Sequence, residues 1–337
     1  MMEIRQIRTW QEIQAVRDSW DRAVAACSEP SFFLTSTWFS SWWEHLAEDH
    51  ELCTFVLSDE SSDSLGFAPL MRRAETLAFP ASREVTDYCD FVFPAGCAGR
   101  MLEGLLRHIA RELPMIQSIE LINLPASSPT LSFLPELAPR FGFHSRVERS
   151  EAVPVLTLPD AYPEYLSRLS RKNRHELRRK IRRTEGLPEI RHHIITDPVL
   201  IRDHMPDFIA LHRSVSPDKE RFWCKPGIPE FFQTALSRLA DHRLAALHVL
   251  YSGRTQAAGL ITGFYGKTVY FYNIAYALEF AAASPGYFLI DRAIRQAIAD
   301  GRERADFLRG EEKYKFEFGA QIGTIYNLIL NKREFTA

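Results

Sequence analysis

The sequence predicts a mixed α/β fold built from two related domains in tandem. The chain has 337 residues, more than one typical core, and this length fits two domains of about 150 residues each. A hydrophobic fraction of 46% with 25% charged residues is typical of a globular protein. The same order of hairpin, strand, helix and strand recurs in both halves. We therefore expect domains at residues 1–155 and 156–337, each a mixed β-sheet flanked by helices, with Pro154, Pro159 and Pro163 marking the connection.

In the first half, segments of helical periodicity alternate with strand-like segments. Thr35 is placed to cap a helix rich in tryptophan. A polar turn at 59–64 separates two strands and favours a β-hairpin. The expected helices are 10–26, 36–46 and 99–111, the expected strands are 52–58, 65–72 and 116–122, and 123–130 is expected to be a loop.

The second half shows the same rhythm. Ser284 and Pro285 predict a helix start, with the serine as N-cap and the proline in the first turn. The strand expected at 267–275 is rich in β-branched and aromatic residues. The other expected strands are 244–251, 256–264, 305–308 and 322–330, and the expected helices are 168–183, 285–300 and 311–318.

Composition excludes several classes of protein. The net charge of −2 gives no overall attraction to nucleic acid or anionic membranes, and DNA is not an expected partner. The five cysteines form no CxxC pair and argue against a disulfide framework. The N-terminus lacks the apolar region of a signal peptide, and no run is long enough to span a membrane. We expect a cytoplasmic protein, for which a peripheral contact with the inner membrane is compatible with the sequence.

Motifs for metals, nucleotides and serine nucleophiles are absent from the sequence. The eleven histidines show no HExxH spacing, and His192 and His193 would point to opposite sides of a strand. No Gly-x-Ser-x-Gly, Walker or Rossmann pattern occurs. We expect neither a metal site nor a permanently bound cofactor.

Two charged segments stand out instead. From Asp306 to Gly319, an apolar strand end gives way to Arg, Glu, Tyr and Lys within a few residues, and such groups are costly there unless they face a cleft. The stretch from Arg168 to Arg183 contains nine Lys and Arg residues and one acid, Glu176. Leucines along one face would let this helix dock on a core while its basic remainder meets an anion.

These segments carry a resemblance to a known family. The sequence Asp306-Phe-Leu-Arg-Gly-Glu-Glu-Lys-Tyr-Lys315, the basic helix and the aromatic helix Phe32–Trp38 resemble the tandem-domain FemAB-like and CelD-like branch of the GNAT acyltransferases. Tyr314-Lys315 followed by Phe318-Gly319 is similar to the Phe-Lys-x-x-Phe-Gly pattern of Fem peptidyltransferases. The resemblance covers about residues 32–320 and implies two tandem GNAT-like domains that transfer an acyl or aminoacyl group to an amine without a metal.

Acyl transfer to an amine needs a proton acceptor, oxyanion stabilisation and a proton for the leaving group. Asp306, Glu311 and Glu312 are candidates for the base. The sequence does not decide between the two adjacent glutamates. By analogy with the Fem pattern, Lys315 is the first candidate for an essential residue, and Tyr314 for the proton donor. A surface helix with Glu311 paired to Lys315 is the structural alternative. The candidate catalytic residues are Lys315, Glu311, Glu312, Asp306 and Tyr314.

The remaining candidates bind substrates. Donor or anion binding is expected at Arg309, Ser284, Gly286, Arg171, Lys172, Arg174 and Arg178, because cations and helix N-termini attract phosphates. Only Gly286 remains of the glycine-rich loop of ordinary GNAT proteins. Acceptor binding is expected at Asp87, Tyr88, Asp90, Tyr272, Asn273 and Trp38, although turns and core packing also account for these residues.

The resulting expectation is an N-acyltransferase. Its co-substrate would be acyl-CoA or acyl carrier protein, and its acceptor an amine of a cell-envelope precursor, an amino sugar or a sphingoid-type lipid. The sequence shows no helical-hairpin insertion of the kind that Fem enzymes use for tRNA, which favours a thioester donor. Two alternatives stay open: an aminoacyl-tRNA-dependent Fem-like peptidyltransferase, and a non-catalytic module that binds an anion or polymer.

Overall fold

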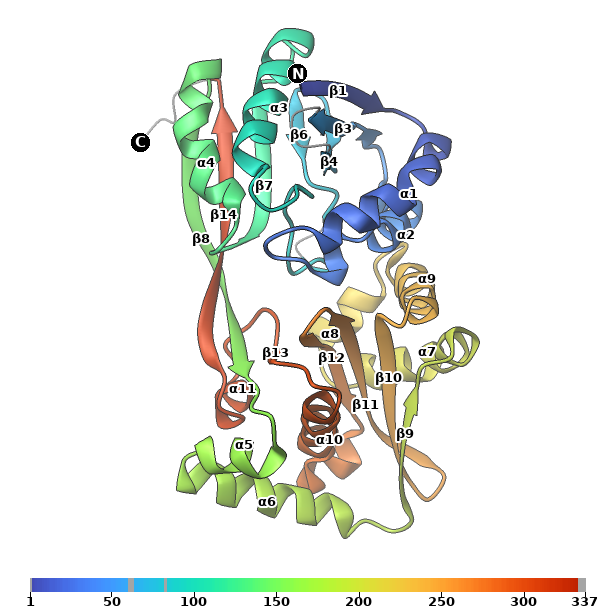
Figure 1. Ribbon diagram of the computed structural model, residues 1–337. Coiled ribbons are helices and arrows are strands. Elements are labelled where there is room, and N and C mark those ends of the chain that lie inside the picture. Colours follow the sequence, from blue (N-terminus) through green and yellow to red (C-terminus); the bar gives the residue numbers. More distant parts are fainter. Residues whose placement is uncertain (1, 60–63, 82–83, 333–337) are drawn as a thin grey trace. The chain divides into compact units, whose positions relative to one another are not determined.

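The computed structural model describes residues 2–59, 64–81 and 84–332, which divide into two compact units (Figure 1). The first unit contains the described residues up to Glu151 and those from Thr324 onward, and the second unit is Ala152–Gly323. The division lies four residues before the expected boundary at 155/156, and the last strand groups with the first unit instead of the second.

The first unit has two sheets and four α-helices. Strands β1, β3 and β4 form an antiparallel sheet, which contains the hairpin expected from the sequence, although residues 60–63 of its turn lie outside the described ranges. In the other sheet the order is β2-β5-β6-β7-β14, with β6 and β7 parallel. The elements are β1 (Met2–Ile7), α1 (Trp10–Ala25), α2 (Ser36–Leu46), β2 (Glu51–Leu52), β3 (Thr54–Asp59), β4 (Ser64–Ala68), β5 (Met71–Arg73), β6 (Thr76–Ala78), α3 (Ala98–Glu112), β7 (Ser118–Pro125), α4 (Pro129–Leu137) and β14 (Gln321–Asn331), with 3-10 turns at Phe32–Leu34 and Ala138–Phe141.

The strands of the second unit have the order β8-β13-β12-β11-β10-β9 and are part of an 11-stranded mixed sheet, in which β8 is next to β14. Among these strands of the second unit only β12 and β13 are parallel, since the helix between them carries the chain back across the sheet. The elements are β8 (His144–Thr157), α5 (Tyr162–Arg168), α6 (Arg171–Glu185), β9 (Ile190–Ile195), α7 (Pro198–Arg213), α8 (Pro217–Trp223), α9 (Ile228–Asp241), β10 (Ala245–Ser252), β11 (Thr255–Tyr265), β12 (Thr268–Tyr276), a 3-10 turn (Leu278–Ala283), α10 (Pro285–Ala299), β13 (Arg304–Asp306) and α11 (Lys313–Glu317).

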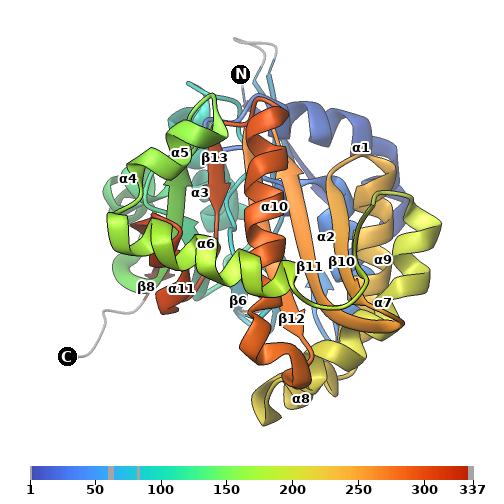
Figure 2. The ribbon, with the colours of Figure 1, turned by 90° about the horizontal axis from the view of Figure 1, so that it is seen from below.

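Helices cover both faces of this sheet. A Cβ atom on Gly286 of α10 would lie 3.1 Å from Ile274 of β12, so glycine allows close packing on that face. On the opposite face, Gly259 of β11 leaves room for the ring of Phe208 in α7, because a Cβ there would lie only 2.7 Å from the ring. Helix α6 crosses α10, as Figure 2 shows, and Leu177 and Ile181 are its buried residues toward this core. The expected mixed α/β fold is therefore confirmed.

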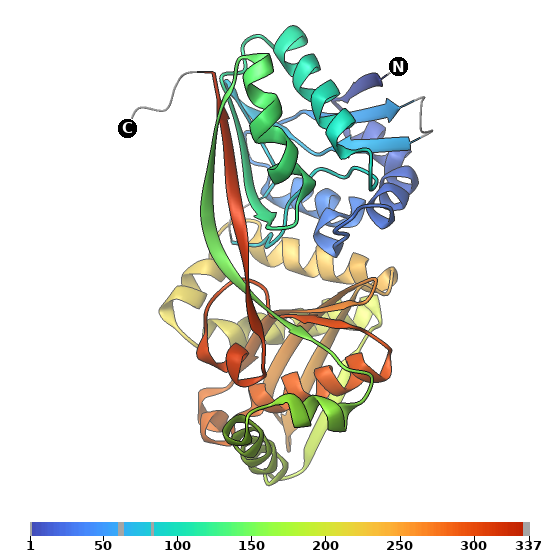
Figure 3. The same cartoon turned by 60° about the vertical axis from the view of Figure 1, so that its left-hand side comes forward.

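Several details differ from the expectations. Residues 150–157, expected as a connection, belong to β8, a strand of 14 residues that contains Pro154 and runs from one unit into the other (Figure 3). Sequence reasoning did not place helices α7, α8 and α9, which fill residues 198–241. Pro206 lies inside α7. Proline usually marks the end of a helix, so its presence obscures the apolar periodicity of a helix that runs through it.

Two other properties concern the described residues as a whole. None of their helices has the length and hydropathy needed to cross a bilayer. They also contain no group of three or more His, Cys, Asp or Glu side chains arranged to hold a metal ion.

Candidate functional site

Strands β12 and β13 separate after a short parallel pairing. Thr268, Val269 and Tyr270 pair with Arg304, Ala305 and Asp306, and within the described residues β12 then pairs only with β11. The chain after β13 turns toward β8 instead: the Phe307 amide donates to Pro154 O (2.9 Å) and the Gly310 amide to Ala152 O (3.0 Å). The edge of β12 beyond Tyr270 is thus left without a strand partner and can pair with an extended ligand.

A β-bulge lies at the start of this edge. Ile261 pairs with Asn273 and Thr262 with Phe271, which leaves Tyr272 as the extra residue of β12. The Tyr272 ring stacks on Phe232 of α9 with centroids 5.6 Å apart, so its place is fixed by packing. Bulges of this kind redirect the backbone and are frequent next to active sites. Tyr272 and Asn273 are both half-buried, and their expected role in acceptor binding stays a prediction.

Lys315 holds the loop that follows β13. Its ammonium group is buried and donates to the carbonyls of Leu308 (3.3 Å), Arg309 (2.5 Å) and Gly310 (3.2 Å). It also pairs with the Glu312 carboxylate at 2.9 Å, whereas the alternative considered above was Glu311. With its donors used in this way, Lys315 positions the loop, and its geometry does not support direct contact with a substrate.

The loop backbone is strained. Leu308 has φ = 57° and Gly310 has φ = 108°. A side chain at Gly310 would collide with the Glu312 carboxylate. Asp306 is fully buried and accepts from the Leu308 amide at 2.8 Å, which stabilises the turn. Strained backbone held by surrounding contacts is common at active sites, and here Asp306 and Lys315 supply those contacts from both sides.

The other candidates of this segment differ in exposure. Glu311 and Glu312 are exposed. The sequence predicted that both lie in a helix at 311–318, but α11 begins at Lys313, so both residues precede it. Burial raises the pKa of Tyr314, and the nearby Glu312 carboxylate raises it further, which keeps the phenol protonated. The Tyr314 ring contacts Phe307 and Tyr287. A protonated phenol can donate a proton to a leaving group.

Helix α6 forms a basic groove with α11. The groove has a volume of about 930 Å³ and contains only two acids, Glu176 and Glu317. Hydrogen bonds from Arg179 lower the pKa of Glu176 to about 2, so this acid is already neutralised by its neighbour. The basic lining residues are Arg171, Lys172, Arg174, His175, Arg178, Arg182 and Lys313.

Most of these cations lack a counterion. Arg174 donates to the Leu166 carbonyl at 3.2 Å, but among the described residues Arg171, Lys172 and Arg178 have no side-chain hydrogen bond or ion pair. Uncompensated cations on one helix repel one another, and this is a cost that a bound anion removes. The structure therefore brings Arg171, Lys172, Arg174 and Arg178, all expected from the sequence, into one groove.

A network that sequence reasoning missed links the groove to the loop helix. Glu317 of α11 accepts from Tyr287 Oη (2.7 Å) of α10 and pairs with Lys180 of α6 (3.0 Å). The Lys180 ammonium also lies 3.4 Å from the centroid of the Tyr287 ring. Three elements far apart in sequence meet here, so no spacing rule signals the network.

The start of α10 differs from the expected cap. Ser284 is the N-cap residue, but it has φ = 62° and its side chain makes no capping bond, which contradicts the expected role of the serine. The Thr184 hydroxyl donates to Ala283 O at 2.7 Å and fastens the end of α6 to this turn. The start of α10 therefore lies beside the end of the basic helix. Pro285 has no amide hydrogen and the Tyr287 amide donates to Ser284 O (3.0 Å), so the Gly286 amide is the candidate donor to a phosphate there.

The acceptor candidates of the first unit lie in a packed region. Trp38 is buried and donates from its indole to Thr86 at 3.2 Å. Trp38, Tyr88 and Asp90 line a cavity of only about 30 Å³, little more than a water molecule needs. Burial raises the pKa of Asp90 to about 6, although it accepts hydrogen bonds from the Phe91 amide and Thr130. Asp87 is buried as well, so this group supports packing more than acceptor binding.

Comparisons with known proteins agree with this geometry. Residues 171–316 match the model of a family described as an acetyltransferase (GNAT) domain. The matched segment runs from the start of α6 to α11 and includes the separated strands. No curated protein shows significant sequence similarity to the chain.

Solved structures share the fold at low sequence identity. FemX has a TM-score of 0.64 at 13% identity, with 97% of this chain and 96% of FemX covered. L-PGS from Bacillus licheniformis has a TM-score of 0.63 at 11% identity, with 99% and 95% covered. A tandem GNAT protein from the clavulanic acid biosynthesis pathway has a TM-score of 0.50 at 10% identity, and both chains are covered completely. The chain thus carries a GNAT-type acetyltransferase domain at residues 171–316 and is a transferase.

Proposed function

We propose that the second unit transfers an acyl group from a thioester, acyl-CoA or acyl carrier protein, to the amine of a cell-envelope precursor, an amino sugar or a sphingoid-type lipid. The observation that carries the proposal is the separation of β12 from β13 beside the loop held by Lys315. An extended thioester arm with amide groups can pair with the open β12 edge, and its carbonyl then lies near the residues that follow β13.

The reaction forms a C–N bond and breaks a C–S bond. The acceptor must lose its ammonium proton before the amine attacks. We assign this proton to one of the two exposed carboxylates of the loop, Glu311 or Glu312. The leaving thiolate takes a proton from Tyr314, which burial keeps in the protonated form, and the proton that the nitrogen loses as the amide forms returns to the Tyr314 phenolate. Asp306 and Lys315 hold the loop, and Arg309 is left as a candidate for contact with the donor.

The α6 groove would bind the phosphates of the donor. Arg171, Lys172 and Arg178 offer uncompensated charge for this, and Ser284 and Gly286 lie at the adjacent start of α10. Exposed phosphate contacts contribute mostly affinity and salt dependence. We further propose that the protein belongs to the tandem FemAB-like and CelD-like branch and that the first unit is a second GNAT-like domain.

An aminoacyl-tRNA donor is the second candidate. The row of uncompensated cations on α6 favours it, since a groove of about 930 Å³ is larger than one pyrophosphate requires. Against it, no helix in the described ranges is longer than 16 residues, so the long helical hairpin of Fem enzymes has no counterpart there. A module that binds anions without catalysis is the third candidate.

The test is thiol release from acetyl-CoA, long-chain acyl-CoA and acyl carrier protein in the presence of glucosamine, a UDP-amino sugar or sphinganine. We expect turnover with one thioester class, and a loss of about 100-fold in kcat for Tyr314→Phe at unchanged melting temperature. Glu303→Gln, an exposed acid before β13, is the matched control and should keep full activity.

Other outcomes decide between the candidates. Transfer from charged tRNA with no thioester turnover would replace the proposal by the second candidate. Anion binding without transfer from any donor, in a well-folded sample, would leave the binding module. Full activity of Tyr314→Phe would remove Tyr314 from the mechanism.

A further inference from the structure

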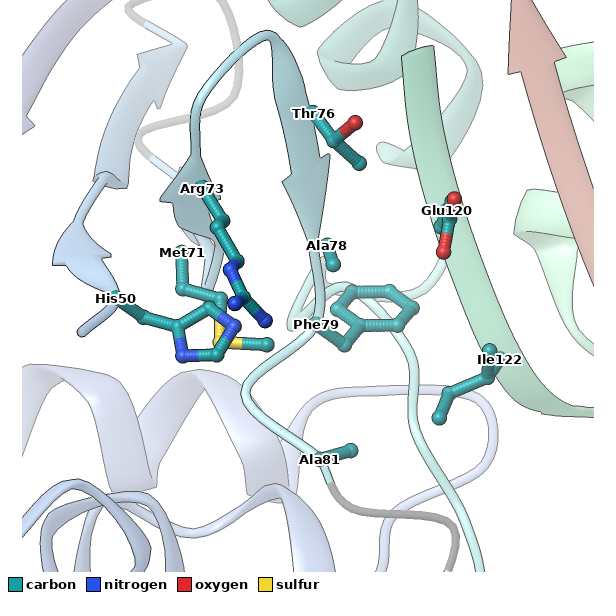
Figure 4. Close-up of a pocket in the computed structure, with 9 residues that line it drawn as sticks. All are labelled: His50, Met71, Arg73, Thr76, Ala78, Phe79, Ala81, Glu120 and Ile122. Carbon is teal, nitrogen blue, oxygen red and sulfur yellow. The ribbon is translucent and has the colours of Figure 1, made fainter. Parts of the chain in front are cut away.

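A recess in the first unit combines opposite charges with an apolar floor. It has a volume of about 390 Å³ and lies over strands β5, β6 and β7 (Figure 4). All its lining residues belong to the first unit, so it is separate from the transferase site described above. The lining residues are His50, Met71, Arg73, Thr76, Ala78, Phe79, Ala81, Glu120 and Ile122.

The sheet register places these side chains on one face. Met71 pairs with Ala78 and Arg73 with Thr76, and Ala78 pairs in turn with Glu120. Because side chains alternate along a strand, these residues point to one side of the sheet. The intervening residues Leu77, Ile119 and Leu121 are buried in the core on the other side. The recess is therefore the outer face of this part of the sheet.

Arg73 and Glu120 carry the charges of the recess. Both are exposed, and within the described ranges neither makes a side-chain hydrogen bond or an ion pair. They lie two strands apart and two residues out of register, which puts their Cα atoms roughly 12 Å apart by standard strand spacing. In Figure 4 the ring of Phe79 lies between them. Both side chains are exposed and extend from the same face of the sheet, so their charged groups can turn toward the carboxylate and the ammonium of one ligand.

The space between the charges is apolar. Met71 and Phe79 are buried, and Ile122 is half-buried at the end of the recess. His50 lies beside Arg73 with its Nδ1 bonded to the Ala47 carbonyl (2.7 Å), which fixes the ring. An apolar ligand side chain placed against these residues would lose its own contact with water, and this burial would stabilise the complex.

We propose that this recess binds a zwitterionic small molecule of the amino-acid class with an apolar side chain. Arg73 donates two hydrogen bonds to the ligand carboxylate, and Glu120 accepts hydrogen bonds from the ligand ammonium. Phe79, Met71 and Ile122 contact the ligand side chain. The inference uses only contacts within the first unit and does not depend on the transfer reaction.

The experiment is calorimetric titration of the full chain with L-leucine and L-phenylalanine. Two analogues each lack one charge: leucine amide has no carboxylate, and 4-methylpentanoate has no ammonium. We expect saturable binding of at least one zwitterion and an affinity at least tenfold lower for both analogues. Absence of binding at millimolar concentrations, or equal binding of the analogues, would overturn the proposal.

Variants then assign the site. Arg73→Gln and Glu120→Gln should each lower the affinity tenfold or more, and the loss should match that of the analogue lacking the charge that each residue binds. Arg111→Gln and Glu112→Gln, exposed residues of α3 outside the recess, are the matched controls and should bind as the unaltered protein does. Unchanged affinity in either recess variant of normal melting temperature would also overturn the proposal. If one variant does not fold, the other decides.

Discussion

The loop after β13 and the groove of α6 contain the same residue types but use their charges in opposite ways. In the loop, the ammonium of Lys315 is buried and meets three carbonyls and one carboxylate. In the groove, Arg171, Lys172 and Arg178 are exposed or half-buried and meet no partner in the described part of the chain. A buried charge must be compensated by groups of the protein, whereas an exposed charge is solvated by water and stays available to bind a ligand.

This difference in burial and pairing separates two roles, positioning the loop and binding an anion, that the sequence does not distinguish. Lys315 was the first candidate for an essential residue, and its surroundings now assign it to positioning the loop. The α6 cations were candidates for anion binding, and the absence of counterions supports that role. Substitutions should therefore affect folding stability in the loop and ligand affinity in the groove.

Lys315→Met should give the largest effect on stability. The substitution removes the ammonium donor of three loop carbonyls, and each buried acceptor left without a partner costs about 1–3 kcal/mol, so we expect a loss of about 3 kcal/mol or more. Chemical denaturation measures the free energy of unfolding directly. A variant that loses activity but unfolds as the unaltered protein does would return Lys315 to the list of direct catalytic groups.

Glu317→Gln should give a smaller effect that depends on pH. Burial raises the pKa of Glu317, but the Tyr287 hydrogen bond and Lys180 lower it more, so the folded-state pKa lies below its usual value of 4.5. Ionised Glu317 therefore stabilises the fold above pH 4.5, and this contribution fades as pH falls through the folded-state pKa. We expect a loss of about 1–2 kcal/mol at pH 7 and a much smaller loss near pH 3. A difference that persists unchanged in acid would contradict the ionic role of Glu317.

Neutralising the groove should give the smallest effect on stability. We expect the triple variant Arg171→Gln, Lys172→Gln and Arg178→Gln to change the free energy of unfolding by less than about 0.5 kcal/mol, since no protein partner is lost. CoA binding, measured by calorimetry at low salt, should weaken at least tenfold and lose part of its salt dependence. Lys219→Gln with Lys267→Gln removes two cations outside the groove and should leave CoA binding unchanged. A large loss of stability in the triple variant would show that the comparison between loop and groove is wrong.

The limits of sequence reasoning are visible in individual residues. The order of β12, α10 and β13 was predicted, because periodicity identifies each element and the helix start at Pro285 is clear. Their parallel pairing is a finding of the structure. The network of Lys180, Tyr287 and Glu317 could not be predicted, since its members lie in three elements with no common motif. The recess at Arg73 and Glu120 was missed for the same reason, because strand register, and not spacing, places the two residues on one face.

By itself, the sequence determined the mixed α/β fold and most of its helices and strands. It also determined the two charged segments that led to the prediction of a transferase. These features depend on local patterns: the period of apolar residues, capping signals and the density of charge. Tertiary structure alone decided that Lys315 is buried and fully bonded, that the α6 cations are uncompensated, and that β8 is continuous where a connection was expected. The physical reason is that burial and pairing depend on neighbours brought from distant parts of the chain, and these set whether a charge supports the fold or remains available to a ligand.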